Sequence, residues 1–426
     1  MEEILITGSG SELQGVGRLS DGRAVFVPGA LPGERVRVEI TKSKDRFAEA
    51  QLLSVIEAAP ERQAPDCPYY PACGGCRARH MTYESSLRLK RERVYSALTR
   101  IGGLDAGIDV ASAQPSPLTQ GYRNKAELAC AGPAVGVFEE GSRRVIDTER
   151  CLLQPECVNA LLAGIRPYIK GLNPKYIVPR VNSKGEMMLT LSFIYPADIE
   201  KAAFELTKAF NFIKSVYICV LRQGHTHALD GRCTKVCGAD TLTEELCGLT
   251  FSVSPRSFFQ VNRLQAEKLY SLALEMAELK PGEQVCDIYC GAGTISLCAA
   301  RTAGHVTGIE IVPEAIRDAK SNAKVNKLTK KTEFLCGDAA KLYPKLARQF
   351  DCVITDPPRA GMEKPVIDAL IEHPAKRLVY VSCDPGTLAR DIKLLTQSGA
   401  YKFVRAIPVD MFPWTGHVET VVLLVR

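Results

Sequence analysis

The sequence lacks the features that mark a membrane, secreted or disordered protein. Its 426 residues contain no low-complexity tract, and no apolar run approaches the roughly 18 residues that a bilayer-spanning helix needs. The start, Met1-Glu2-Glu3-Ile4, lacks the basic and then apolar layout of a signal peptide. A hydrophobic share of 46% and a charged share of 24% are ordinary for a globular chain. We therefore expect a cytoplasmic protein of several domains, without membrane contact and with no indication of an obligate protein partner.

Excess positive charge is also scarce, because the net charge is only +6 at pH 7. That excludes a histone-like polycation. Much of the excess lies between Arg77 and Arg100, where seven Lys and Arg residues stand against two Glu residues. The stretch predicts either a local contact with a polyanion or a solvated helix face, and the sequence leaves both interpretations open.

The first part of the chain, residues 1–58, alternates short apolar segments with glycine turns. This pattern predicts several short strands in a small closed barrel. The stretch from Gly15 to Glu34 resembles a TRAM domain, the OB-like RNA-binding barrel of RNA-modifying enzymes. Because the segment itself is slightly acidic, we expect RNA contacts from particular residues, namely Lys42, Lys44 and Arg46.

The rest of the chain divides into two further predicted domains. Residues 59–254 mix helix and strand patterns and predict a central α+β domain. Residues 255–426 alternate strands with helices, for example a strand over 305–310 followed by a helix over 313–326. Such alternation predicts an α/β, Rossmann-like, doubly wound parallel sheet.

A glycine turn with Gly291 and Gly293 follows the first strand of this sheet, after Asp287. At such a turn a cofactor can approach bare backbone. Glu310 ends the next strand and can accept hydrogen bonds from two ribose hydroxyls. The turn has no third glycine for a pyrophosphate, so it favours S-adenosylmethionine (SAM) over a dinucleotide, while a sheet without a cofactor remains the other interpretation.

Two strand ends carry residues suited to uracil chemistry. Cys383 ends the fifth strand, at the edge where doubly wound folds place their sites. A thiolate that adds to carbon 6 of uracil makes carbon 5 nucleophilic, and a base must later remove the carbon 5 proton. Glu419, in the last hairpin, is a candidate base. Taken singly, such a Cys is usually a small buried hydrophobe and such a Glu a surface residue.

Five motifs taken together resemble the RNA uracil-C5 methyltransferases: Phe258-Phe259-Gln260-Val261-Asn262, Asp287-Ile288-Tyr289-Cys290-Gly291, Asp356-Pro357-Pro358-Arg359, Val381-Ser382-Cys383-Asp384-Pro385 and His417-Val418-Glu419-Thr420. The resemblance implies SAM-dependent methylation of uracil carbon 5, with Cys383 as the nucleophile and Glu419 as the base. It also implies contacts to the methyl donor or target base by Gln260, Tyr289, Glu310, Asp338 and Asp356. Asp384 and Thr294 stand where the family commonly has Asn, which puts the loop beside the nucleophile and a cofactor contact by Thr294 in question.

The chain has 16 Cys residues, and in a reducing compartment they favour metal, cluster or catalytic chemistry over disulfides. Cys67, Cys73 and Cys76 are closely spaced, and Cys151 follows later. From the spacing alone, a zinc ion, a [4Fe-4S] cluster and free thiols all remain open. The spacing resembles that of the 23S ribosomal RNA members of the family, which implies a [4Fe-4S] cluster on these four residues.

The same resemblance implies one or two uridines of 23S ribosomal RNA as the target, with a tRNA uridine as the alternative. Two other classes are less well supported. Radical methylthiotransferases also join a TRAM barrel to a cluster, but their cysteine spacing differs. A non-catalytic RNA-binding protein would not need both Cys383 and Glu419.

Overall fold

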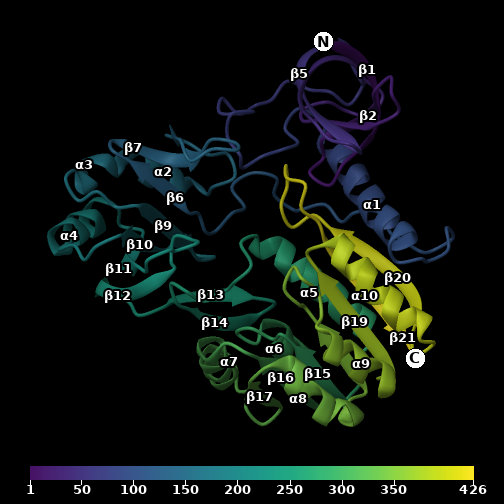
Figure 1. The fold of residues 1–426 in the computed structure, drawn as a ribbon. Helices are drawn as coiled ribbons and strands as arrows, with labels where there is room; N and C mark the ends of the chain where they lie inside the picture. Colours follow the sequence, from purple (N-terminus) through teal and green to yellow (C-terminus); the bar gives the residue numbers. More distant parts are fainter.

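The computed structural model describes the backbone of residues 1–426 and every side chain except that of Arg348. Figure 1 shows a barrel that contains the N-terminus, a central sheet, and a larger sheet with flanking helices that contains the C-terminus. Within the described part of the chain, no helix is both long and apolar enough to cross a membrane.

The N-terminal part is a closed five-stranded barrel, which confirms the prediction from the short alternating segments. Its strands are β1 (Glu2–Ser9), β2 (Gly15–Arg18), β3 (Ala24–Val27), β4 (Arg35–Ser43) and β5 (Phe47–Glu57), paired in the order β1-β2-β3-β5-β4. Buried and exposed side chains alternate along the strands, so that Ile4, Val36 and Val38 fill the interior. Gly17 allows β1 and β2 to approach closely, because a Cβ there would lie 2.5 Å from Cγ2 of Ile4.

Helix α1 (Tyr83–Arg100) follows the barrel in the chain. The side chain of Thr82 caps its first turn by accepting a hydrogen bond from the Ser85 N–H (3.3 Å). The apolar face around Leu98 packs against α10 (Pro385–Gln397) and belongs to the core of the C-terminal part. A helix that the sequence assigns to the central domain therefore packs on the C-terminal one.

The central part is a mixed seven-stranded sheet that shares its apolar core with three helices. Its elements are β6 (Leu128–Ala131), β7 (Ala134–Phe138), β8 (Val145–Asp147), α2 (Glu156–Gly164), α3 (Arg166–Ile169), β9 (Tyr176–Val181), β10 (Met187–Phe193), α4 (Glu200–Ala209), β11 (Ile213–Leu221) and β12 (Gly231–Gly238). The strand order is β12-β11-β10-β9-β6-β7-β8. The β10–β11 pair is parallel and its neighbours are antiparallel.

A hairpin of β13 (Leu242–Leu246) and β14 (Leu249–Val253) stands just before position 254, where the sequence predicts a domain boundary. Most of its buried apolar side chains belong to the core of the C-terminal part, whereas Leu242 packs with Met188 and Tyr217 of the central sheet. The Ser252 N–H also donates to Oδ1 of Asn322 (3.0 Å) in the C-terminal part. The division after residues 58 and 254 stays a prediction, because the packing of α1 and of this hairpin crosses it.

The C-terminal part is a seven-stranded sheet covered by helices on both faces. Its elements are α5 (Arg263–Ala277), β15 (Gln284–Ile288), α6 (Thr294–Ala300), β16 (His305–Glu310), α7 (Pro313–Val325), β17 (Thr332–Cys336), α8 (Ala339–Leu346), the 3₁₀ turn η1 (Ala347–Gln349), β18 (Cys352–Thr355), α9 (Lys364–Glu372), β19 (Arg377–Ser382), α10, β20 (Lys402–Val409) and β21 (Glu419–Val425). The strand order is β17-β16-β15-β18-β19-β21-β20, with β21 antiparallel to both neighbours.

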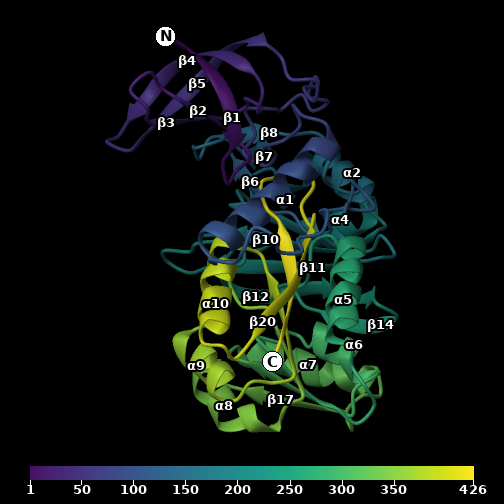
Figure 2. The same ribbon diagram turned by 90° about the vertical axis from the view of Figure 1, so that its right-hand side faces the viewer.

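Figure 2 shows α5, α6 and α7 on one side of this sheet and α8, α9 and α10 on the other. This confirms the predicted doubly wound fold. The strand order reverses between β15 and β18, so the fold places a crevice outside the carboxyl ends of these two strands.

Candidate active site

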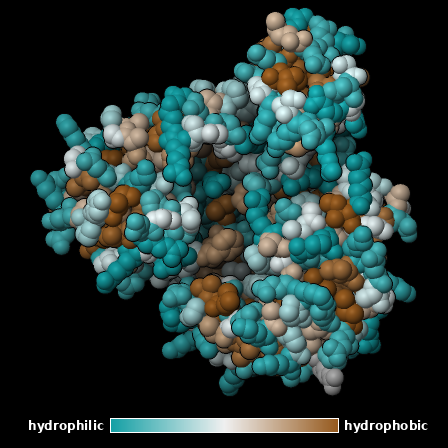
Figure 3. Space-filling model, in the orientation of Figure 1, coloured by the Kyte–Doolittle hydropathy of each residue, from teal (hydrophilic) through white to brown (hydrophobic). Residues whose placement is uncertain are grey.

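A cavity of about 1360 Å³ lies at the carboxyl ends of the parallel strands and is also lined by residues of the central part. In Figure 3 the molecular surface is hollowed between these two parts. The seven residues that the sequence predicts for catalysis and cofactor binding all line this cavity: Gln260, Tyr289, Glu310, Asp338, Asp356, Cys383 and Glu419. The fold thus brings together residues that are far apart in the chain.

The glycine turn forms one wall of the cavity. Gly291 and Gly293 have φ angles of 54° and 81°, which favour glycine, and a Cβ on Gly293 would lie 3.0 Å from the Phe334 ring. The Glu310 carboxylate accepts from the N–H of Gly291 (3.2 Å) and from the N–H of Val312 (2.9 Å). Each carboxylate oxygen can accept a second hydrogen bond, so Glu310 keeps acceptor capacity toward the cavity.

Two buried polar atoms beside this turn have no hydrogen-bond partner among the described residues: Oδ1 of Asp287 and the hydroxyl of Tyr289. Burial raises the pKa of Asp287 to about 7. The other oxygen of Asp287 accepts from Ser296 (2.5 Å). Buried polar groups normally have partners, so both atoms are suited to contact a polar ligand in the cavity.

The side chains of Asp338 and Thr294 are engaged locally. Asp338 caps α8, with Oδ1 accepting from the N–H of Ala340 (2.9 Å). The Thr294 hydroxyl donates to the Tyr270 hydroxyl (3.3 Å). The Thr294 hydroxyl is therefore already used in a hydrogen bond inside the protein.

Cys383 and Glu419 face each other through the sheet register. Ser382 at the end of β19 pairs with Thr420 of β21, so the next positions along the two antiparallel strands are also opposite. Cys383 is half-buried, whereas Glu419 is buried with 5% of its surface exposed. The backbone thus places a thiol beside a carboxyl group at one end of the cavity.

Burial raises the pKa of the acidic groups at this end, and nearby negative charge adds to the rise at Cys383 and Glu419. The pKa of Cys383 rises to about 11 through burial and then through the nearby charges of Glu419 and Asp356. Burial and the Asp356 charge raise the pKa of Glu419 to about 8, and burial raises that of Asp356 to about 7. Arg359 is the cation that acts against these shifts at Cys383 and Glu419.

Sequence reasoning gave no catalytic role to Arg359 or His417, although both lie in the motifs. Nη2 of Arg359 and Nδ1 of His417 are 3.0 Å apart, and both residues line the cavity. Burial, followed by the Arg359 charge, lowers the pKa of His417. A neutral His417 accepts a hydrogen bond from Arg359 and so holds this cation beside the reactive end.

Asp384 caps α10, directly after the cysteine. Its Oδ1 accepts from the N–H groups of Gly386 (2.9 Å) and Thr387 (3.0 Å). Asp and Asn are about equally good in this position. The departure from the family pattern is therefore compatible with an ordinary helix start beside the nucleophile.

The basic stretch from Arg77 to Arg100 is, as a whole, neither a polyanion contact nor a solvated helix face. Arg79 and Lys90 are almost completely buried, with 1% and 0% of their surfaces exposed. Arg91 donates to the Val110 carbonyl (3.0 Å), and Arg93 to the Gly416 carbonyl (2.6 Å). Several of these cations thus serve internal contacts and are not available to a polyanion.

The four predicted metal ligands are free cysteines, all partly exposed. Cys76 and Cys151 pack against the small cluster of Tyr122, Leu153 and Trp414. Burial, and then the charges of Cys151 and Cys73, raise the pKa of Cys76. Among the described residues, no group of three or more His, Cys, Asp or Glu side chains is arranged to hold a metal ion. The cluster therefore stays a prediction. Gly74 and Gly75, within this loop, line the cavity.

The fold and the glycine turn define a class of protein, and comparison with known proteins agrees. Residues 279–405 match a methyltransferase domain, and residues 1–53 match a TRAM domain. The protein is thus a methyltransferase with an N-terminal TRAM barrel.

An uncharacterized RNA methyltransferase of Halalkalibacterium halodurans is 38% identical over 95% of this chain and 92% of its own. One of Clostridium acetobutylicum is 36% identical over 100% of this chain and 96% of its own. The chain therefore belongs to this family of RNA methyltransferases. The crystal structure of Pyrococcus abyssi tRNA (uracil-54, C5)-methyltransferase with S-adenosyl-L-homocysteine is similar over 100% of both chains, with a TM-score of 0.81 and 26% identity.

Proposed function

We propose that this protein transfers a methyl group from SAM to carbon 5 of uridine in RNA. The observation that carries the proposal is the placement of Cys383 opposite Glu419, in the same cavity as the glycine turn. A thiol and a base at one point are the two groups that methylation of uracil carbon 5 requires. The similarity over full length to a uracil-C5 methyltransferase supports the same chemistry.

The cofactor pocket fits SAM in three respects. Glu310 has acceptor capacity for ribose hydroxyls, and Tyr289 and Asp287 offer buried polar atoms that lack partners among the described residues. Asp338, Gln260 and Asp356 all line the same cavity. On the sequence resemblance, Asp338 would lie near the adenine, and Gln260 and Asp356 would contact the methyl donor or the target base. When bound, SAM supplies a methyl group activated by a positively charged sulfur.

The protein's own residues perform the remaining steps. Cys383 has a pKa of about 11, so its thiol must first lose a proton, which the neighbouring Asp356 carboxylate can accept. The thiolate then bonds to carbon 6 of the uracil, and carbon 5 becomes the nucleophile that takes the methyl group. Glu419 next removes the carbon 5 proton. The electron pair of that C–H bond forms the C5–C6 double bond as the C6–S bond breaks, which restores the Cys383 thiolate.

The target is an unpaired or extruded uridine, because a stacked base exposes neither face of carbon 6 to a thiolate. We place it in 23S ribosomal RNA, at one or two positions, on the sequence resemblance. A tRNA uridine is the second candidate, favoured by the tRNA enzyme that matches over 100% of both chains. The barrel would add backbone contacts through Lys42, Lys44 and Arg46, which are all exposed beside the β4–β5 turn.

A [4Fe-4S] cluster on Cys67, Cys73, Cys76 and Cys151 fits one further observation. Arg79 is 1% exposed, and its Nε and Nη2 have no partner among the described residues. The charge of Arg79 and a hydrogen bond from its guanidinium oppose the rise in the pKa of Cys76, so the guanidinium lies beside this thiol. A cluster held by four thiolates is anionic, and a buried cation beside one of them suits it. Methyl transfer needs no electron, so we assign the cluster a structural role.

The test is methyl transfer from SAM to unmodified 23S rRNA and tRNA transcripts, with products mapped by mass spectrometry of nuclease fragments. Methylated uridine in the rRNA is expected, and methylation confined to tRNA would retain the chemistry but overturn the rRNA assignment. No methylation of uridine in either RNA would contradict the proposed function. Iron, sulfide and visible absorption, measured on anaerobically purified wild type and on Cys76→Ser, test the cluster separately.

A further inference from the structure

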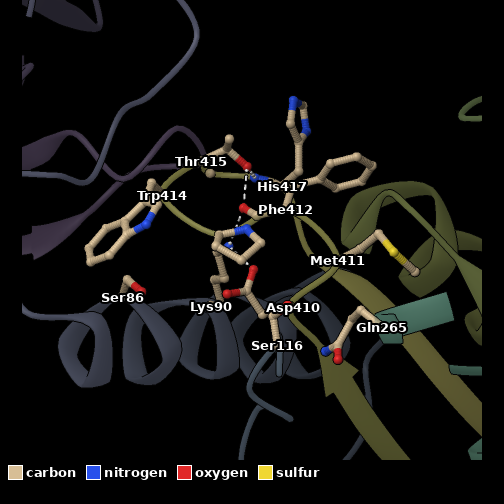
Figure 4. Close-up of polar contacts among 12 residues, drawn as sticks. Ser86, Lys90, Ser116, Gln265, Asp410, Met411, Phe412, Trp414, Thr415 and His417 are labelled. Carbon is tan, nitrogen blue, oxygen red and sulfur yellow. Dashed lines mark hydrogen bonds and ion pairs between the residues drawn. The ribbon is translucent and has the colours of Figure 1, made fainter. Parts of the chain in front are cut away.

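The molecule contains a second buried charged group, outside the set that lines the cavity. Lys90 of α1 and Asp410, which follows β20, are both 0% exposed, with Nζ and Oδ1 2.5 Å apart. Lys90 also donates to the Phe412 carbonyl (3.1 Å), and Figure 4 shows it reaching from the helix to both residues. A buried ion pair is expensive to desolvate and often gives no more stability than apolar side chains of the same size. Stability alone is therefore a weak reason for this pair.

Asp410 is the next residue after the cross-strand partner of the proposed base. Val409, which precedes Asp410, is the cross-strand partner of Glu419. The segment 410–418 connects these two strands, and Lys90 holds its beginning. Arg93, one turn further along α1, donates to the Gly416 carbonyl (2.6 Å) near its end. One helix face thus fixes both ends of the segment that leads into Glu419.

The same network reaches the opposite wall of the cavity. The Tyr83 hydroxyl donates to Oδ2 of Asp410 (2.7 Å) and accepts from the N–H of Ser116 (2.9 Å). Oγ of Ser116 accepts from Nδ2 of Asn262 (3.0 Å), which also donates to the Met411 carbonyl (3.1 Å). Asn262 belongs to the motif that contains Gln260. Buried and partly buried hydrogen bonds therefore join the segment that leads into Glu419 to the motif that contains Gln260.

We propose that the Lys90–Asp410 pair positions Glu419 for removal of the carbon 5 proton. This rests on the proposed function, which supplies the role of Glu419. Neither residue lines the cavity, so both act through Val409 and the segment 410–418. Cys383 follows β19 and is not a member of the network. Loss of the pair therefore slows proton removal and release of the RNA more than it slows formation of the covalent adduct.

The test compares these two steps in single-turnover reactions with an RNA transcript that the wild type methylates. The main variant, Lys90→Met/Asp410→Asn, removes both charges and leaves no unpaired charge buried. It is expected to form the protein–RNA adduct, seen on a denaturing gel, at close to the wild-type rate. Release of methylated RNA is expected to be about 10- to 100-fold slower, since small misplacements of a catalytic group have effects of this order.

Tyr83→Phe, which removes one hydroxyl from the network, is expected to show a smaller effect in the same direction. If the double variant does not fold, Tyr83→Phe provides the test of the positioning proposal. Lys393→Met, on the exposed face of α10, is the matched control and is expected to keep the wild-type ratio of the two rates. Glu419→Gln is the positive reference and is expected to accumulate the adduct.

If the double variant keeps the wild-type ratio of RNA release to adduct formation, the positioning proposal is overturned, even if the protein is less stable. If the double variant does not fold, an unchanged ratio in Tyr83→Phe overturns it instead. If instead the wild type methylates uridine but Glu419→Gln accumulates no adduct, the assigned role of Glu419 fails, and the positioning proposal fails with it. A normal Glu419→Gln result with a normal double variant removes the positioning proposal alone.

Discussion

Two buried groups of ionisable residues in this protein differ in how their charges are matched. Lys90 and Asp410 carry opposite charges and contact each other at 2.5 Å. Cys383, Asp356 and Glu419 are all acids. Burial raises the pKa of all three, and neighbouring negative charge also raises that of Cys383 and Glu419. The oppositely charged pair holds a segment in place. The raised pKa values of Asp356 and Glu419 lie near neutral pH, so these two carboxyl groups can take up and release protons there.

The largest expected effect comes from removing the thiol of the unmatched group. Cys383→Ala is expected to lower methyl transfer by on the order of 10⁴-fold or more, because the nucleophile has no substitute in the mechanism. SAM binding, measured by calorimetry, is expected to change little. Methylation at the wild-type rate by this variant would remove the mechanism.

Breaking the matched pair on one side is expected to have the largest effect on stability. Lys90→Met leaves the Asp410 carboxylate buried and without its cation, which typically costs about 3–5 kcal/mol. Lys90→Met/Asp410→Asn is expected to recover most of that loss. Chemical denaturation of the two variants measures the difference, and equal stability of both would show that charge matching is unimportant here.

The unmatched group also predicts a pH dependence. Glu419 acts as a base only when ionised, so the rate of RNA release is expected to fall about tenfold per pH unit below its pKa of about 8. Its contribution to stability has the opposite sign. The folded pKa lies above the ordinary 4.5, so this contribution is full below pH 4.5 and is lost as the pH rises toward 8.

Glu419→Gln separates these two effects. The variant cannot ionise at this position, so its thermal stability is expected to decline less between acidic and mildly alkaline pH than that of the wild type. A parallel decline in both proteins would show that Glu419 is not the buried acid responsible.

The smallest expected effect comes from Asp384, which caps the start of α10 directly after Cys383. Asp384→Asn is expected to leave both stability and activity nearly unchanged, because both side chains cap equally well. Asp384→Ala removes the acceptor for two N–H groups and is expected to cost about 1 kcal/mol. Thermal unfolding of both variants measures this. A large loss of activity in Asp384→Asn at unchanged stability would reveal a role beyond capping.

Much of the fold follows from local patterns. The strand predicted over 305–310 is β16 (His305–Glu310), and the helix predicted over 313–326 is α7 (Pro313–Val325). Strand pairing also explains why Cys383 and Glu419 meet. Uracil chemistry made both residues candidates from the sequence, and the family resemblance then implied that they act together. Their roles, like those of the cofactor residues, stay predictions that the geometry supports.

The burial of Lys90 had no local signal. The charges of α1 resemble those of a solvated helix, and the partner of Lys90 lies 320 positions away in the chain. Contacts across such a separation depend on how the parts pack, which charge patterning does not encode. The identity of any metal at the four cysteines could not be predicted from their spacing either, because spacing alone does not distinguish a cluster from zinc.

The antiparallel strand β21 has a consequence for the timing of folding during synthesis. It lies between β19 and β20, both of which the ribosome makes earlier. Until residues 419–425 emerge, β19 has an unfilled edge and β20 has no neighbour in the sheet. The strand that completes the sheet begins with Glu419 itself. A nascent chain therefore gains Glu419 only in the same event that places β21 between β19 and β20. Under the proposed mechanism, a chain without this strand would lack the base that releases the methylated RNA.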